Sequence, residues 1–299
     1  MGKIAFVFSG QGDQYPGMGK ELAGKYPAAE AVFSACDAIR PGTSAQCFAG
    51  SEEELKETRN TQPCLFAMEL AAAAVLKEHG VIPDAAAGFS LGEVAAAAAC
   101  GLFDPETGFR LVCRRGELMQ REAEKSDTAM AAVVKLTAEQ VEEICGQFRE
   151  VYPVNFNCPG QVTVSGLSSE MADFSEAVKA AGGRAIPLKV KGGFHSPFMR
   201  EAAEAFAEEL DKADIRENTI PLYSNMTAEP YSGNAAEVLS RQICSPVQWE
   251  RIIRNMIADG VDTFIEIGPG KTLCNMIRRI GDGVRAVPVT EYLAEVEAC

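Results

Sequence analysis

Residues 88–92, Gly-Phe-Ser-Leu-Gly, have the spacing of a nucleophile elbow around Ser90. The short apolar stretch 81–87 before them predicts a buried strand, and the alanine-rich stretch 93–100 after them predicts a helix. A strand, a tight turn and a helix form the context in which this pattern exposes a serine hydroxyl beside backbone N–H groups. The same spacing also occurs in plain Gly/Ser turns, so the functional interpretation needs a base elsewhere in the chain.

The chain has only two histidines, which makes the search for that base short. His79 ends a predicted helix beside Gly80, and its position is typical of a surface or C-cap residue. His195 lies in a loop after two glycines and an aromatic residue, so it is the better candidate. In an α/β-hydrolase the histidine of the triad lies near the C-terminus, whereas His195 lies well before it. We therefore expect a Ser–His dyad whose imidazole is oriented by a backbone or amide carbonyl.

Two glycine-rich turns resemble nucleotide-binding motifs, but each lacks a required glycine. The strand predicted at 3–9 leads into the turn 10–14, where a dinucleotide fingerprint would need glycine at Tyr15. The turn 268–272 resembles the end of a phosphate loop, which would need glycine at Ile265. The first turn is either a plain connection or a way to bring backbone amides to the reacting centre.

The order of the elements predicts an α/β fold in two parts. Residues 128–190 follow a β-α-β-β-α-β order, which is typical of a small ferredoxin-like domain. We expect it to be inserted in a large α/β-hydrolase-like domain with a parallel sheet, made of residues 1–127 and 191–299. Within the large domain, helices are predicted over 18–36 and 104–121.

Composition narrows the class of protein. A net charge of −14 over 299 residues argues against binding to nucleic acid or to an anionic membrane surface. The ten cysteines form no C-x-x-C pair, which favours buried thiols in a reducing compartment over a metal site. With neither a signal peptide nor an apolar stretch long enough to cross a membrane, we expect a cytoplasmic protein.

Taken together, eight stretches give the chain a resemblance to malonyl-CoA:acyl carrier protein transacylases. In order, they are FVFSGQGDQ (6–14), TQP (61–63), GFSLGE (88–93), RGELMQ (115–120), VNFNCPGQ (154–161), FHSP (194–197), SPVQW (245–249) and EIGPGK (266–271). Each stretch alone is weakly specific, but eight in the family's order are highly specific.

The resemblance implies roles for the residues that carry out the acyl transfer. Ser90 matches the nucleophile that becomes malonylated, and His195 matches its base. Gln11 and Leu91 match the residues whose backbone amides form the oxyanion hole. Gln248 matches the residue whose carbonyl orients the histidine. The expected cycle is ping-pong, with CoA leaving before the phosphopantetheine thiol of acyl carrier protein attacks.

A second group of residues is implied to select the acyl group. Arg115 matches the arginine that binds the free carboxylate of malonate, and Gln62 matches a polar residue of the same pocket. Phe194 fits the family's association of an aromatic residue with malonyl rather than branched units. The sequence departs from the family at Phe89, where histidine is usual, and at Asp13, where serine is usual.

The expected partners are malonyl-CoA and an acidic acyl carrier protein. Coenzyme A enters as part of the substrate, and we expect no bound cofactor or metal. We also expect the enzyme to be a monomer. Lys189 and Lys191, with Arg278 and Arg279, could form a basic patch for the carrier, or could be scattered solvated charges. Three other interpretations remain open: a hydrolase of the same fold, an acyltransferase of a polyketide synthase, and a non-catalytic carrier-binding module.

Overall fold

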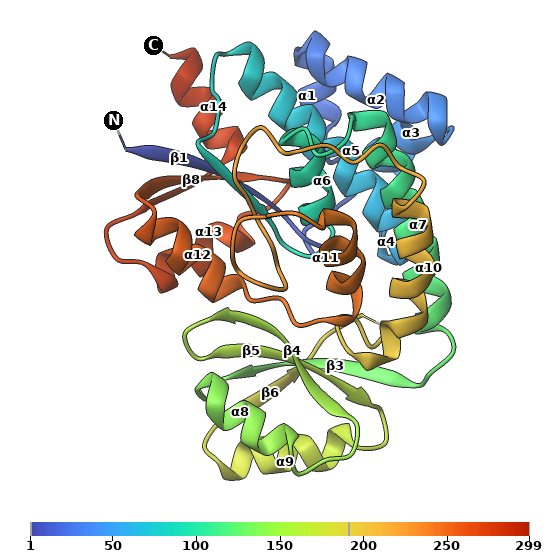
Figure 1. The fold of residues 1–299 in the computed structure, drawn as a ribbon, viewed down its shortest axis with the longest axis vertical. Helices are drawn as coiled ribbons and strands as arrows, with labels where there is room; N and C mark the ends of the chain where they lie inside the picture. Colours follow the sequence, from blue (N-terminus) through green and yellow to red (C-terminus); the bar gives the residue numbers. More distant parts are fainter. Residues whose placement is uncertain (1, 191, 299) are drawn as a thin grey trace.

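The computed structural model describes residues 2–190 and 192–298. Figure 1 shows two sheets, one above the other, with the N- and C-termini near each other at the upper one. The larger sheet has five parallel strands in the order β7-β2-β1-β8-β9. Their bounds are β1 (Lys3–Phe8), β2 (Ala85–Gly88), β7 (Leu222–Tyr223), β8 (Val261–Ile267) and β9 (Arg285–Pro288). The mixed α/β fold with a parallel sheet agrees with the prediction.

The central strands of this sheet are apolar because both of their faces are covered. All four residues of β2 are buried, as are the last four of β1 and of β8. Continuous apolar runs of this kind are typical of parallel strands between two layers of helices. The helices of this unit are α1 (Lys20–Lys25), α2 (Pro27–Ile39), α3 (Thr43–Ala49), α4 (Glu52–Lys56), α5 (Thr58–Glu78), α6 (Gly92–Ala99), α7 (Pro105–Ala123), α10 (Arg200–Leu210), α11 (Ala235–Arg241), α12 (Trp249–Ala258), α13 (Thr272–Ile280) and α14 (Val289–Glu297), with two 3-10 turns, η1 (Pro197–Met199) and η2 (Gln242–Cys244).

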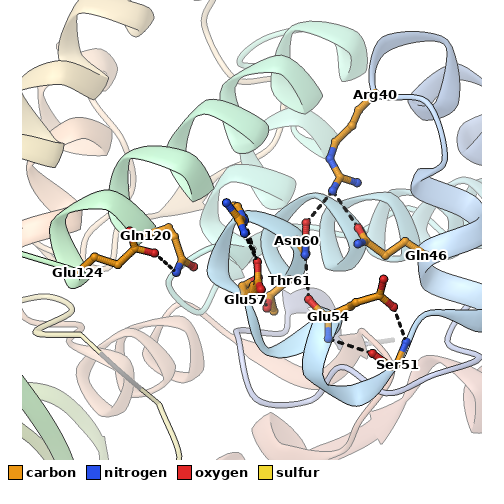
Figure 2. A network of polar contacts seen from close by, with 10 residues as sticks. Arg40, Gln46, Ser51, Glu54, Glu57, Asn60, Thr61, Gln120 and Glu124 are labelled. Carbon is orange, nitrogen blue, oxygen red and sulfur yellow. Dashed lines mark hydrogen bonds and ion pairs between the residues drawn. The ribbon is translucent and has the colours of Figure 1, made fainter.

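Helix α5 carries Gln62 into the centre of the molecule, and its first turn is held by a polar network (Figure 2). Arg40 donates to the side chains of Gln46 and Asn60, both at 2.8 Å. Asn60 in turn donates to the Glu54 carbonyl at 2.9 Å, at the end of a capping box that starts α4. These contacts fix where α5 begins, and therefore where Gln62 lies one turn later.

The large unit differs from the prediction in two places. The single helix expected over 18–36 is divided into α1 and α2, because Tyr26 is extended and Pro27 begins the second helix. The strand β9 and the helix α14 were not predicted; β9 adds the last strand at one edge of the sheet. His79 is the C-cap of α5, as expected.

The second sheet has four antiparallel strands in the order β4-β5-β3-β6. Its elements are β3 (Thr128–Val134), α8 (Ala138–Cys145), β4 (Val151–Cys158), β5 (Gln161–Leu167), α9 (Met171–Ala180) and β6 (Arg184–Pro187). Both helices cover the face that points away from the parallel sheet (Figure 1). The edge strand β4 is joined to the large unit, because Val154 and Phe156 exchange backbone hydrogen bonds with Val247, each of 2.9 Å.

Within the described residues, no helix combines the length and the apolar character needed to cross a membrane.

Candidate active site

Ser90 lies in a sharp turn between β2 and α6, as the spacing of the elbow predicts. Its φ of 55° is in the left-handed region, a conformation that costs a non-glycine residue of order 1–3 kcal/mol. The two flanking glycines allow close approach of backbone. A Cβ on Gly88 would lie 2.0 Å from the Gly92 carbonyl carbon, and one on Gly92 would lie 2.4 Å from the Phe8 carbonyl oxygen. Only glycine therefore fits at either position.

His195 meets Ser90 as the sequence predicts. Its Nε2 lies 2.7 Å from Ser90 Oγ, and its Nδ1 lies 2.9 Å from the backbone carbonyl oxygen of Gln242. Because the carbonyl only accepts, Nδ1 carries the proton, and Nε2 is free to accept from the serine hydroxyl. Burial, and then the nearby charge of Arg115, lowers the pKa of His195 to about 4. The imidazole is therefore neutral at physiological pH, as a general base must be.

The assignment of the histidine-orienting carbonyl to Gln248 was wrong. Gln242 holds Nδ1, whereas Gln248 begins α12 six residues later and donates its backbone N–H to the Asn225 carbonyl at 2.8 Å. The physical reason is local. Gln242 starts a 3-10 turn directly beneath the histidine loop, where Ile243 also accepts the His195 N–H at 3.1 Å.

Arg115 lies behind the nucleophile with its side chain fully buried. It donates to the amide oxygens of Gln62 at 2.8 Å and Gln242 at 2.9 Å, and approaches Ser90 Oγ at 3.5 Å. Within the described residues no carboxylate forms an ion pair with it, and its Nε has no acceptor. Burial lowers its pKa to about 10, so it remains charged at neutral pH. A buried cation held only by neutral amides is suited to receive an anion.

Two backbone N–H groups are free to hold an oxyanion. Among the described residues, neither the Gln11 N–H nor the Leu91 N–H has an acceptor, and both residues line the cavity that contains Ser90. The Gln11 side chain turns to Thr58 Oγ1, at 3.4 Å, so the expected contribution of Gln11 is that of its backbone. Leu91 immediately precedes α6, where the helix dipole also favours negative charge.

The cavity has a volume of about 280 Å³ and lies between the two units. From the large unit, Gln62, Phe194 and His195 line it, and from the small sheet Met130 and Asn155 do so, among others. Arg115 is one layer behind this wall, since Gln62 both lines the cavity and accepts from the guanidinium.

Phe89 and Asp13, the two departures from the family pattern, are both accommodated by their surroundings. The Phe89 ring packs edge-on against Trp249, with ring centroids 5.5 Å apart. Asp13 accepts from the Thr272 hydroxyl at 2.5 Å, and its burial raises the pKa of its carboxyl. Neither residue touches His195 or Arg115 through a hydrogen bond among the described residues.

Four polar residues of the site were not found from the sequence: Gln242, Asn225, Glu93 and Tyr231. Gln242 donates to the Ser90 carbonyl at 2.7 Å, besides its contacts with His195 and Arg115. Glu93 lies within the GFSLGE stretch, but no sequence pattern assigned it a role. Asn225 and Tyr231 reach the elbow from more than a hundred residues away in the chain. No local spacing reveals contacts of that kind.

The proposed basic patch has mixed support. Lys189 is exposed, while Lys191 lies outside the described residues. Arg279 donates to the Pro159 carbonyl and to the side chain of Gln161, both at 2.8 Å, so it ties α13 to the small unit. Arg278 donates to the Ala286 carbonyl. Both arginines remain exposed enough to present charge.

The residues that the structure describes include no group of three or more His, Cys, Asp or Glu arranged to hold a metal ion.

Comparison with known proteins identifies the family of the chain. A family model described as an acyl transferase domain matches residues 5–296. A malonyl CoA-acyl carrier protein transacylase of Bacillus subtilis is 40% identical, over 97% of this chain and 94% of its own. The crystal structure of a transacylase of that name from Clostridium perfringens has a TM-score of 0.95 at 35% identity, covering 99% and 98% of the two chains. A malonyl-transacylase solved with a type II polyketide synthase acyl-carrier protein has a TM-score of 0.94 at 33% identity, covering 99% of this chain and 100% of its own. The chain belongs to the acyl transferase family.

Proposed function

We propose that this enzyme transfers a malonyl group from malonyl-CoA to the phosphopantetheine thiol of acyl carrier protein. The observation that carries the proposal is Arg115, a buried guanidinium with only neutral acceptors, whose Nη2 lies 3.5 Å from Ser90 Oγ. Malonyl-CoA is a thioester with a carboxylate at its far end, which matches a nucleophile beside a buried cation. The names of the relatives support both the malonyl group and the carrier protein.

In the first half-reaction, Ser90 Oγ attacks the thioester carbonyl while His195 Nε2 takes the hydroxyl proton. The Gln11 and Leu91 backbone N–H groups hold the oxyanion of the tetrahedral intermediate. The C–S bond then breaks, and His195 returns the proton to the CoA sulfur, leaving a malonyl ester on Ser90. In the second half-reaction, His195 takes the proton of the carrier thiol, whose sulfur attacks the ester, and returns it to Ser90.

The orienting carbonyl belongs to Gln242 in this mechanism. By accepting from Nδ1 it fixes the tautomer and stabilises the imidazolium that forms in each half-reaction. Gln62 and Phe194 line the acyl pocket, and the bulk of Phe194 disfavours a methyl group on the malonyl α-carbon.

We propose further that 128–190 is an inserted domain of ferredoxin-like topology, and that 1–127 with 191–299 forms a domain of α/β-hydrolase type. The β-α-β-β-α-β order and the β4-β5-β3-β6 sheet support the first assignment. The elbow at the end of a parallel strand supports the second. The free thiols of the described cysteines are consistent with a cytoplasmic enzyme, which we expect to work as a monomer without a bound cofactor.

Transfer within a polyketide pathway is the second candidate, because one structural relative was solved with a polyketide carrier and another is an acyltransferase domain of the salinomycin polyketide synthase. The chemistry at Ser90 would be the same, and only the carrier would differ. A hydrolase of the same fold has less support, since it has no need of Arg115.

Intact-protein mass spectrometry after mixing with malonyl-CoA, acetyl-CoA or methylmalonyl-CoA tests the proposal, with and without phosphopantetheinylated carrier protein. We expect a malonyl adduct that is absent in Ser90→Ala and that moves to the carrier. An adduct lost to water at one rate with or without carrier would instead establish a hydrolase. No adduct from any acyl-CoA would leave a binding role.

A further inference from the structure

Behind the nucleophile elbow lies a buried polar side chain that the transfer mechanism does not use. Asn225 follows β7, has no exposed surface, and is far from Ser90 in the sequence. Its Oδ1 accepts the Ser90 backbone N–H at 2.7 Å, and its Nδ2 donates to the Gly88 carbonyl at 2.5 Å. One amide therefore bridges the two peptide groups on either side of Phe89.

The backbone polar groups of the elbow can be accounted for one by one. The Phe89 N–H donates to Phe8 at 2.9 Å, and the Phe89 carbonyl accepts from Gly92 at 3.0 Å. The Ser90 carbonyl accepts from the side chain of Gln242 at 2.7 Å. With the Ser90 N–H on Asn225, the Leu91 N–H is the one elbow donor left without an acceptor among the described residues.

We propose that Asn225 is a positioning residue that holds Ser90 in its left-handed conformation and thereby directs the Leu91 N–H into the oxyanion hole. The left-handed conformation at φ 55° is unfavourable for serine, so it persists only where surrounding contacts impose it. If the peptide between Ser90 and Leu91 rotated, the Leu91 N–H and the serine Oγ would both leave their places. The inference rests on the proposed roles of Ser90 and Leu91.

Asn225 is itself anchored at both of its backbone polar groups. Its N–H donates to Glu93 Oε1 at 3.0 Å, and its carbonyl accepts from the Gln248 N–H at 2.8 Å. The same Glu93 oxygen accepts from the Tyr231 hydroxyl at 2.6 Å. Glu93 lies in the first turn of α6, directly after the elbow. The helix therefore also fixes the position of Asn225, whose side chain holds the elbow.

The test compares Asn225→Ala and Asn225→Asp with wild type in single-turnover malonylation of Ser90 and in steady-state transfer to carrier protein. We expect Asn225→Ala to lower kcat by about 10²-fold, the scale on which loss of an oxyanion donor acts. KM for malonyl-CoA should change little, because Arg115 and Gln62 are untouched. Asn225→Asp keeps the size and the Ser90 acceptor, but when ionised it places a carboxylate oxygen against the Gly88 carbonyl oxygen, so its activity should fall as the pH rises and the new carboxyl ionises.

Asn255→Ala is the matched structural control. Asn255 donates from α12 to the Ala228 carbonyl at 2.9 Å, on the same segment that follows β7, and among the described residues it has no hydrogen bond with the elbow. We expect this variant to lower Tm without lowering kcat. A generic phosphonofluoridate that labels Ser90 supplies a readout independent of malonyl recognition, and its rate should fall in Asn225→Ala only.

Malonylation at the wild-type rate in Asn225→Ala would overturn the proposal. So would a loss of kcat that Asn255→Ala reproduces at an equal loss of Tm, because the effect would then be one of general stability. These outcomes differ from failure of the proposed function, in which wild type itself would form no transferable malonyl adduct.

Discussion

Two buried ionisable side chains, Arg115 beside Ser90 and Glu69 beside Ser9, respond to burial in opposite ways. Each has no exposed surface, and each is hydrogen-bonded to neutral groups, Arg115 to two glutamine side chains and Glu69 to the Ser9 hydroxyl at 2.7 Å. Burial raises the pKa of Glu69 well above its ordinary value, so the carboxyl can take up a proton and become neutral. Arg115 keeps its charge in the same degree of burial.

The difference shows that a buried group indicates a binding site when it keeps its charge, and not when it can become neutral. A carboxyl that neutralises itself needs no ligand, and Glu69 fits a structural role between α5 and the end of β1. A guanidinium that stays charged among amides is compensated only in part, by the charge of Glu93, which forms no ion pair with it among the described residues, so it favours the arrival of an anion. Burial and hydrogen bonding are common to both residues, so the fixed charge of Arg115 is what supports our proposal that it selects the acyl group.

Removal of Arg115 should have the largest effect. Arg115→Ala is expected to lower kcat/KM for malonyl-CoA by about 10³-fold, roughly 4 kcal/mol of transition-state binding, while acetyl transfer falls far less. Arg115→Lys should recover only part of the loss, because an ammonium cannot form the bidentate contact. Rates with both acyl-CoA substrates measure the change in selectivity.

Arg114→Ala is the control, since the neighbouring arginine is partly exposed and ion-paired with Glu117 at 3.0 Å and Glu209 at 3.4 Å. It should leave both substrates unaffected. An unchanged ratio of malonyl to acetyl transfer in Arg115→Ala would refute the assignment.

The burial of His195, and after it the positive charge of Arg115, should also affect the pH dependence of malonylation. Neutral His195 is the active form, and its pKa of about 4 means that the rate of Ser90 malonylation stays level from pH 8 down to about 5. An ordinary histidine, with a pKa of about 6.5, would already lose about tenfold at pH 5.5. Rapid-quench measurement between pH 4 and 8 checks this, and a midpoint near 6.5 would contradict it.

The same shift has a consequence for stability. Because the folded-state pKa of His195 is lowered, the unfolded chain binds the proton more readily between about pH 4 and the ordinary value of about 6.5. The contribution of His195 to the free energy of unfolding is therefore complete above about pH 6.5 and is lost as the pH falls toward 4.

Glu69→Gln tests the other half of the comparison and should act on stability alone. The raised folded-state pKa of Glu69 stabilises the fold at low pH, and this contribution is lost as the pH rises above the unfolded value. Glutamine keeps the acceptor for Ser9 without titrating, so the variant should gain stability over wild type as the pH rises from 5 to 8. The gain should grow with each unit of pH across this range.

Denaturant unfolding at both pH values measures this gain, with Glu78→Gln on the exposed surface of α5 as the control for the change in net charge. If Glu69→Gln abolished transfer, Glu69 would not be merely structural, and the contrast with Arg115 would fail.

How much of the site could be predicted depended on whether its residues are close in the chain. The turn at Ser90 was predictable because it is a local pattern, and the contact of Ser90 with His195 was predictable because the chain offers only two histidines. The break between α1 and α2 was also visible in the sequence, at Pro27. Asn225 was not predictable, because only the parallel pairing of β2 with β7 brings it to Ser90.

The orienting carbonyl shows why the rest could not be predicted. Every residue has a backbone carbonyl, so the side-chain type carries no information about which one His195 will meet. Gln242 and Gln248 lie at the two ends of one short segment, and only Gln248 belongs to the SPVQW stretch that carries the family resemblance. The 3-10 turn at 242–244, which decides the matter, has no sequence signal strong enough to find it.

Gln248→Ala should therefore have the smallest effect. The structure uses only the Gln248 backbone N–H, which alanine retains, and the Gln248 side chain makes no hydrogen bond within the described residues. We expect kcat, KM and the pH dependence of malonylation to match wild type. Gln242→Ala, measured beside it, keeps the carbonyl for His195 but removes one of the two amide acceptors of Arg115 and the donor to the Ser90 carbonyl, so it should lose activity. Loss of activity in Gln248→Ala but not in Gln242→Ala would show that Gln248, and not Gln242, supports the site. Arg115, Ser90 and His195 would then not depend on one shared glutamine.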